Sequence, residues 1–428
     1  MSGPTIRKVA GRRVWDSRGR PTVEAEVTLQ GGASGRAIAP AGASTGSGEA
    51  LDRRDGGSAF GGLDVRGAVD AVERVIAPAL LGLDAADQAL VDRTLIELDG
   101  TPDKTRLGAN ATVAVSMAVA HAAAAAAGVP LWRHLLPASH GPALPVPEIQ
   151  IFGGGAHAGR RIDVQDFMVV CPGASSFAEA LDWTAEVYRH AGLLMADAGK
   201  LKGVADEGGF WPEFGSNEEA LSLLVRAIER AGRRPGEEVA ISLDVAASEL
   251  GRGGVYRLGL ERKELDTGGM IDLLTGWLAR YPIRMIEDPL AEDDAPGFAA
   301  FMSGAPAGIL VVADDLAVTD AARVRDLAAG GAANALLIKP NQRGTLSEAR
   351  EAWAAAREAG WSGIVSARSG ESEDVTIVHL AVGWGAPFLK VGSFARSERM
   401  AKWNEGLRIE EALGQDARLA RPAGWSRS

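Results

Sequence analysis

The chain has 428 residues, of which 46% are hydrophobic, and a formal net charge of −11. This length exceeds one small domain and leaves room for a second domain beside an α/β barrel of the usual ~250 residues. No basic tract is long enough to suggest nucleic-acid binding, and no apolar run approaches the ~20 residues that span a bilayer, so the sequence argues against both classes of protein.

Cys171 is the only cysteine, which excludes an internal disulfide and a cysteine-based zinc site. The first twenty residues are basic but lack the apolar segment of a secretory signal. We therefore expect a cytoplasmic protein. Because the net charge is negative, an anionic substrate would need local positive charge from a metal ion, lysine or arginine.

The first 140 residues resemble an α+β domain. Residues 5–30 alternate as two strand-like runs around a turn from Asp16 to Pro21, which predicts an antiparallel start. The Gly-, Ala- and Ser-rich stretch from Gly31 to Gly48 has the composition of a mobile loop or a plain connector. Residues 65–135 follow a helical pattern. Their alanine-rich block, residues 111–132, is expected to be a packed helix rather than a membrane span.

A proline-rich segment around residue 140 predicts the boundary between a capping domain, 1–140, and a second domain, 141–428. The second domain opens with two strand-like runs around a glycine-rich turn, followed by helical stretches at 176–201 and 217–232. From residue 238 to 392, short apolar runs alternate with helical patterns, which is typical of a parallel barrel or a doubly wound sheet.

Nearly every apolar run of this second domain ends in a charged residue. Strands of such sheets place functional groups at their carboxyl ends, so these side chains would converge on one mouth. Crowded carboxylates repel one another unless a hard divalent cation lies among them, and Mg²⁺ suits such oxygen ligands. Solvation of the barrel rim would explain any one of these charges, but not the same rule on successive strands. The residues concerned are Asp244, Glu287, Asp288, Asp314, Asp315, Lys339, Arg368 and Lys390.

Long motifs spread over essentially the whole chain resemble the enolase family. They are WDSRGRPTVEAEV, GASTGSGEAL, LDGTPDKTRLGANA, GGAHAG, ADEGG, SLDVAASEL, YPIRMIEDPLAEDD, VADDLAVT, KPNQRGTLSEA, SARSGESED and ARSERMAKWNEGLRIEEALG. The resemblance implies an α/β fold in which a small α+β domain caps a TIM-like barrel with one antiparallel strand near its start. It also implies Mg²⁺ dependence and a homodimer or a ring of dimers.

The resemblance implies the dehydration of 2-phosphoglycerate, a small anionic phosphocarboxylate, to phosphoenolpyruvate. Enolase-type enzymes abstract a proton beside a carboxylate with a Lys or His base and one or two Mg²⁺ ions. Matching by motif makes Asp244, Glu287 and Asp314 the metal ligands and Lys339 the base, whose pKa Lys390 and the cation would depress. Glu207 resembles the acid that assists the departure of hydroxide. Asp166 occupies the position of a further catalytic carboxylate of the family. The substrate contacts implied by the resemblance are His157, Gln165, Arg368, Ser369 and Lys390.

Four positions depart from the family pattern. Ala41 stands where we expect a serine that closes over the substrate and binds a second metal, a role left to its backbone carbonyl. Gly153 replaces an asparagine, and Asp166 replaces a glutamate, which withdraws the carboxylate by about 1.5 Å. Ala367 replaces a histidine expected near the leaving hydroxide. These changes leave the residues for proton abstraction intact and remove or shorten side chains expected to assist the elimination of hydroxide.

Three functions therefore follow from the sequence. The first is an enolase-type lyase acting on 2-phosphoglycerate or a close analogue. The second is a paralogue from phosphonate metabolism, resembling carboxyphosphonoenolpyruvate synthases, that acts on another phospho- or phosphono-carboxylate. The third is a non-catalytic scaffold with an enolase fold, which lysines buried among carboxylates argue against.

Overall fold

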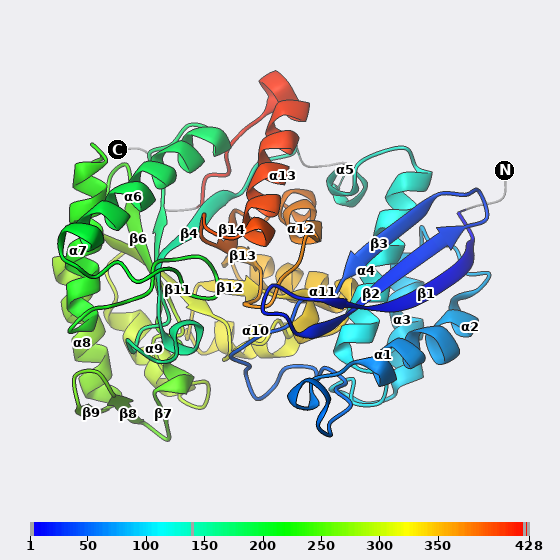
Figure 1. The fold of residues 1–428 in the computed structure, drawn as a ribbon, viewed down its shortest axis with the longest axis horizontal. Coiled ribbons are helices and arrows are strands. Elements are labelled where there is room, and N and C mark those ends of the chain that lie inside the picture. The colour runs from blue at the N-terminus through cyan, green and yellow to red at the C-terminus, as the bar shows by residue number, and fades with distance from the viewer. Residues whose placement is uncertain (1–3, 138–140, 423–424, 426–428) are drawn as a thin grey trace.

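The computed structural model describes residues 4–137, 141–422 and 425. It has a small sheet-and-helix cap, on the right in Figure 1, beside a larger barrel on the left. The predicted fold class, an α/β barrel with an N-terminal α+β cap, is confirmed. The predicted domain boundary near residue 140 falls at residues 138–140, outside the described residues.

The cap is built on an antiparallel sheet with the order β1-β2-β3. Strands β1 (Ile6–Trp15) and β2 (Pro21–Leu29) pair as the alternation predicted. The Asp16 carboxylate closes the turn between them by accepting hydrogen bonds from the backbone N–H groups of Arg18 and Arg20, each at 2.9 Å. Such a local side-chain bond is the usual reason for Asp at the start of a turn.

The third strand corrects the interpretation of residues 31–48 as a loop. Ser34–Ile38 form β3, which pairs with β2 from Glu24 to Thr28. Gly35 contributed to the loop-like composition, but a Cβ there would lie 2.2 Å from the backbone nitrogen of Ala122, so glycine is what lets β3 approach the neighbouring helix. Local composition therefore concealed a packing requirement set by a distant segment.

Helices cover one side of the cap sheet, and the alanine-rich block is its core helix. The cap helices are η1 (Ala59–Gly62), α1 (Arg66–Ala71), η2 (Val72–Ile76), α2 (Ala77–Leu80), α3 (Gln88–Asp99), α4 (Ala109–Ala126) and α5 (Leu131–Leu135). By length and composition, α4 is the one described helix that could cross a bilayer, but 83% of its residues are buried inside the protein. It packs on β2 and β3, as expected of a packed helix.

Eight strands close the barrel in the order β10-β11-β12-β13-β14-β4-β5-β6. All neighbours are parallel except β5, which is antiparallel to both β4 and β6, as the family resemblance implied. The strands are β4 (Val146–Gly153), β5 (Asp166–Val170), β6 (Ala240–Asp244), β10 (Ile283–Glu287), β11 (Leu310–Ala313), β12 (Ala335–Ile338), β13 (Ser362–Ser366) and β14 (Phe388–Gly392).

Helices surround the barrel and begin at capping residues. Ser216 and Thr345 each accept a hydrogen bond from the backbone N–H of a glutamate three residues later, as in a capping box. The helices are η3 (Gly155–Ala158), α6 (Phe177–Asp197), α7 (Asn217–Arg230), η4 (Ala247–Glu249), α8 (Thr267–Arg280), α9 (Ala295–Gly304), α10 (Ala321–Ala329), η5 (Pro340–Gln342), α11 (Leu346–Glu358), α12 (Thr376–Trp384), α13 (Ser397–Leu413) and η6 (Gly414–Asp416).

A small antiparallel sheet, β7 (Gly251–Arg252), β8 (Val255–Leu258) and β9 (Lys263–Asp266), lies outside the barrel and was not predicted. Inside the barrel, every second residue of a strand points to the axis. The inner core includes Val146, Ala240, Val312 and Phe388. Counting in steps of two from these inward-facing residues leads to the polar residues at the strand ends. The alternation of side chains along each strand therefore brings the predicted charges to one mouth of the barrel.

Candidate active site

A small cavity opens at the carboxyl ends of the barrel strands. The cap contributes one wall through residues 42–44, and strand ends and the loops beside them contribute the rest. The lining side chains of the predicted site are His157, Gln165, Asp166, Glu207, Asp244, Lys339, Arg368, Ser369 and Lys390. Segments separated by more than 300 residues thus form one site, as the strand-end pattern predicted.

The predicted metal ligands lie around two lysine ammonium groups. Lys390 Nζ is 2.9 Å from Asp244 Oδ2 and 2.7 Å from Glu287 Oε2, and Lys339 Nζ contacts Asp314 Oδ2. All five residues are buried. The lysines therefore supply positive charge that these carboxylates require.

The carboxylates fit a hard divalent cation by their chemistry. Glu287 Oε1 is buried and has no hydrogen-bond partner in the part of the chain that the structure describes, so it is free to bind an ion. The oxygens of the predicted triad do not all lie within 4.8 Å of one another. Among the described residues, that spacing is met by Asp288, Asp314 and Asp315, and by a second group around His157. The triad assignment stays a prediction.

The surroundings of Lys339 differ from the expectation that its pKa is depressed. Burial and the positive charge of Lys390 both act to lower the pKa of the Lys339 ammonium, the latter as expected, but the Asp314 carboxylate outweighs them and raises the pKa above its ordinary value. The Lys390 pKa lies well above its ordinary value for the same reason, with Asp244 and Glu287 as the main partners. The ion-free site therefore holds both lysines as cations.

Gln165 connects the predicted metal triad to the cavity. Its side-chain Nε2 donates to Asp244 Oδ2 at 3.1 Å, while its Oε1 is buried without a partner among the described residues. The structure places this predicted substrate contact beside the triad, in the cavity wall.

Asp288 positions two of the acidic residues and was recognised in the sequence only as a strand-end charge. Its two carboxylate oxygens accept hydrogen bonds from the backbone N–H groups of Asp314 and Asp315, at 3.0 and 2.9 Å. Its own backbone has a positive φ of 39°, which a non-glycine residue adopts only where its surroundings compensate for the strain. Asp288 therefore fixes the start of the loop after β11.

Thr319 and Gln342 position Lys339 and were missed in the sequence. Thr319 Oγ1 accepts a hydrogen bond from the backbone N–H of Lys339 at 3.0 Å and donates to Gln342 Oε1 at 2.5 Å. Gln342 Nε2 in turn donates to Asp314 Oδ1 at 2.9 Å. Val318 and Thr319 both have positive φ, so this turn is strained where it supports Lys339.

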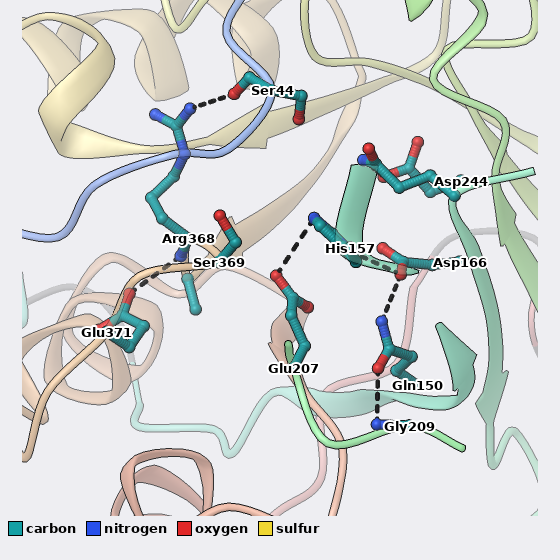
Figure 2. A network of polar contacts seen from close by, with 12 residues as sticks. Ser44, Gln150, His157, Asp166, Glu207, Gly209, Asp244, Arg368, Ser369 and Glu371 are labelled. Atoms are coloured by element: carbon teal, nitrogen blue, oxygen red, sulfur yellow. Dashed lines mark hydrogen bonds and ion pairs between the residues drawn. The ribbon is translucent and has the colours of Figure 1, made fainter. Parts of the chain in front are cut away.

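The anion-binding end of the cavity centres on Arg368 (Figure 2). Its guanidinium binds both carboxylate oxygens of Glu49, at 2.8 and 3.1 Å, and donates to the backbone carbonyl of Ser44 at 3.0 Å. Glu49 therefore ties the cap segment that follows β3 to the barrel. No local pattern indicated a role for Glu49, because its partner lies 319 residues away.

Two further arginines surround the predicted phosphoryl contacts. Arg18, from the cap hairpin, donates to Ser369 Oγ at 3.2 Å. Arg399, from α13, is fully buried and donates to the backbone carbonyls of Arg368 and Ser369 at 2.7 and 2.6 Å. Arg399 positions the strand end, while Arg18, which is paired with Asp16 at 3.1 Å, brings a guanidinium group next to the cavity that the motifs did not indicate.

The structure corrects the role expected of Ala41. Its backbone pairs with Gly370 in both directions at 2.9 Å, and its carbonyl also accepts a hydrogen bond from Arg18 at 2.8 Å. That carbonyl is therefore not available to a second metal ion. The cap serine that lines the cavity is Ser44, three residues later.

His157 lies between two carboxylates, Asp166 and Glu207, as Figure 2 shows. Its Nδ1 is 3.2 Å from Asp166 Oδ1, and its Nε2 is 3.7 Å from Glu207 Oε1. Burial would lower the pKa of His157, but Glu207 and Asp166 raise it to about 9. Gln150 also donates to Asp166 Oδ1. The carboxylate of Asp166 is therefore engaged by His157 and Gln150.

The remaining departures from the family pattern differ in their relation to the cavity. Ala367 lines the cavity, so a histidine side chain at this position would reach into it. Gly153 does not line it, and a Cβ at Gly153 would lie 2.7 Å from Cβ of Ala205. The glycine is thus a packing requirement in this protein. Of the four departures, Asp166 and Ala367 are the two that change the cavity wall.

Comparison with known families agrees with this geometry. Residues 6–135 match the family model described as the enolase N-terminal domain, and residues 142–424 match the enolase C-terminal TIM barrel domain. The two matches together cover nearly the whole chain.

The His157 cluster yields a testable pH dependence. Because the pKa of His157 is raised to about 9 in the folded protein, the imidazolium stabilises the fold fully below its unfolded pKa of about 6.5, and this contribution is lost as pH rises through about 9. NMR of ¹⁵N-histidine-labelled, ion-free protein should show His157 titrating near that value. Asp166→Asn should lower the pKa, whereas His121, whose pKa burial lowers, should not respond. Titration of wild-type His157 near 6.5 would contradict the assignment.

Proposed function

Because the chain belongs to the enolase family, we propose that it is a Mg²⁺-dependent carbon–oxygen lyase that dehydrates 2-phosphoglycerate or a close analogue. The observation that carries the proposal is the pair of buried ammonium groups, Lys339 and Lys390, held among three carboxylates at the barrel mouth. Such a cluster is suited to removing a proton next to a carboxylate, because both the base and compensating positive charge are present.

The cavity offers positive groups at both ends of a phosphocarboxylate. Arg368 and Ser369 would bind the phosphoryl group, with the guanidinium fork matching its oxygens. Arg18 lies beside Ser369 and adds to this end. Lys390 would pair with the substrate carboxylate. The acidic net charge of the chain is thereby offset where an anion must bind.

Lys339 is the proposed base. It must lose its proton before it can accept one from the carbon next to the carboxylate, and the ion-free protein holds it protonated against Asp314. When bound at Asp244, Glu287 and Asp314, Mg²⁺ would supply positive charge that stabilises the dianion developing on the substrate carboxylate. Thr319 and Gln342 would keep the amine in place through the bonds described above.

The departure of hydroxide is assigned to Glu207 as the residue that delivers the proton. The imidazolium of His157, 3.7 Å from the Glu207 carboxylate, holds that proton at rest; Glu207 would take it from His157 and pass it to the hydroxide, which leaves as water. Asp166 is turned towards His157 and Gln150 instead. With alanine at position 367, this end of the cavity carries fewer polar groups than the family pattern. The elimination half is therefore the weaker half of the proposed reaction.

The altered wall favours one second candidate. Asp166 and Ala367 both border the cavity at the elimination end, so a substrate with the same carboxylate and phosphorus group but a different leaving group or tail would fit the same proton-abstraction machinery. We include a phospho- or phosphono-carboxylate of specialised metabolism in the proposal on that ground. A cytoplasmic location and a homodimeric assembly also belong to the proposal.

The first test measures absorbance of the enol product from 2-phosphoglycerate and Mg²⁺. Wild-type protein should form product, and Lys339→Met should reduce the rate by at least 10²-fold, the lower end of a general base contribution. The control is Lys263→Met, on the exposed strand β9, which should retain activity. Binding of Mg²⁺ without product at high enzyme concentration would favour the second candidate, and failure to bind Mg²⁺ or any phosphocarboxylate in calorimetry would favour a scaffold.

A second test targets the elimination end. Combining Ala367→His with Asp166→Glu restores the imidazole and the longer carboxylate of the family pattern, so dehydration of 2-phosphoglycerate should rise by about 10²-fold or more. The matched control is Gly153→Asn, which lies off the cavity and should give no gain because its Cβ meets Ala205. An unchanged rate in the folded double variant would refute the explanation given for positions 166 and 367.

A further inference from the structure

A buried glutamate lies one layer below the cavity, in a place that the proposed reaction does not use. Glu148 is on β4, inside the barrel, and is 1% exposed. Its Oε1 accepts a hydrogen bond from Ser242 Oγ at 2.5 Å. Its Oε2 is buried and has no hydrogen-bond partner among the described residues. An unsatisfied buried carboxylate oxygen is costly, so its presence calls for a partner in another state of the protein.

The nearest candidate for that partner is Lys390. Strands β4 and β14 are parallel neighbours, and their register pairs Lys390 directly with Glu148. Both side chains belong to the inward-facing set of their strands, because Val146 and Phe388, two residues before each, lie in the inner barrel core. Burial raises the pKa of Glu148, and the positive charge of Lys390 opposes that rise. The two groups therefore interact although no direct contact joins them.

Lys390 contacts one carboxylate oxygen on each of two predicted metal ligands. Its Nζ contacts Asp244 Oδ2 and Glu287 Oε2, the two predicted ligands on β6 and β10. A divalent cation and an ammonium group cannot share these oxygens closely, because their charges repel. The lysine must then turn to other acceptors. With Glu287 held by the ion, two buried carboxylate oxygens that have no hydrogen-bond partner among the described residues remain on groups that interact with Lys390, on Asp166 at 3.7 Å and on Glu148.

We infer that Lys390 is the resident counter-cation of the proposed metal triad and that Glu148 receives its ammonium group when a divalent ion takes its place, before the substrate carboxylate binds. Glu148 is thus a positioning residue that acts through Lys390. The inference rests on the proposed metal site at Asp244, Glu287 and Asp314. It explains why a carboxylate with a free oxygen is kept inside the barrel, and it makes metal affinity depend on a residue that does not bind the ion.

The test is a double-mutant cycle read out by calorimetric titration of the ion-free proteins with Mg²⁺. Glu148→Gln should weaken Mg²⁺ binding about ten-fold, the lower end of the effect of residues that support metal ligands. In a Lys390→Met background the same substitution should have no effect, because no ammonium group needs a new acceptor. Asp92→Asn is the control. It alters another fully buried carboxylate, in the cap, and should leave Mg²⁺ affinity unchanged.

The outcomes separate the inference from the proposed function. Absence of Mg²⁺ binding to the folded wild-type protein would overturn the metal site itself. If wild type binds Mg²⁺, then unchanged affinity in Glu148→Gln, or an equal loss in the Lys390→Met background, would overturn the inference alone. Should either variant fail to fold, a crystal structure of the wild type with Mn²⁺ decides. The inference requires Lys390 Nζ to lie within hydrogen-bond distance of Glu148 in that structure. A Lys390 Nζ still between Asp244 and Glu287 would refute the inference.

Discussion

Buried carboxylates at neighbouring strand ends repel one another, and positive charge among them is the condition on which this site depends. Asp244, Glu287 and Asp314 are nearly inaccessible to water, and in the ion-free protein Lys339 and Lys390 neutralise them. The same arrangement provides both a place for a divalent ion and an amine beside it. Charge compensation thus links stability of the barrel mouth to its proposed chemistry.

The fold serves this cluster at several levels. Parallel pairing and two-residue alternation carry the charged side chains to one end of the barrel. Strained turns and buried hydrogen bonds then fix the individual groups, as Asp288 does for Asp314 and as Thr319 does for Lys339. The cap completes the cavity, because Glu49 binds Arg368 across the two domains.

The sequence predicted the parts of the site that follow from local periodicity and from long motifs. Apolar runs ending in Asp244 or Lys339 identify strand ends without knowledge of the fold. Residues whose role depends on distant partners were not accessible in this way. Gly35 resembled a loop residue until α4 was seen against it, and the expected role of Ala41 failed because Gly370 and Arg18 occupy its carbonyl. Glu49 and Arg18 acquire their roles only through contacts over hundreds of residues.

The most direct measurement follows the proton rather than the product. 2-Phosphoglycerate incubated with the protein and Mg²⁺ in D₂O can be monitored by NMR for loss of the signal of the proton on the carbon next to the carboxylate. If Lys339 removes that proton and the elimination half is weakened, deuterium should enter the recovered substrate, and it should not do so in the absence of Mg²⁺. A fully protonated substrate after prolonged incubation, with Mg²⁺ and substrate both bound and no product formed, would contradict the account.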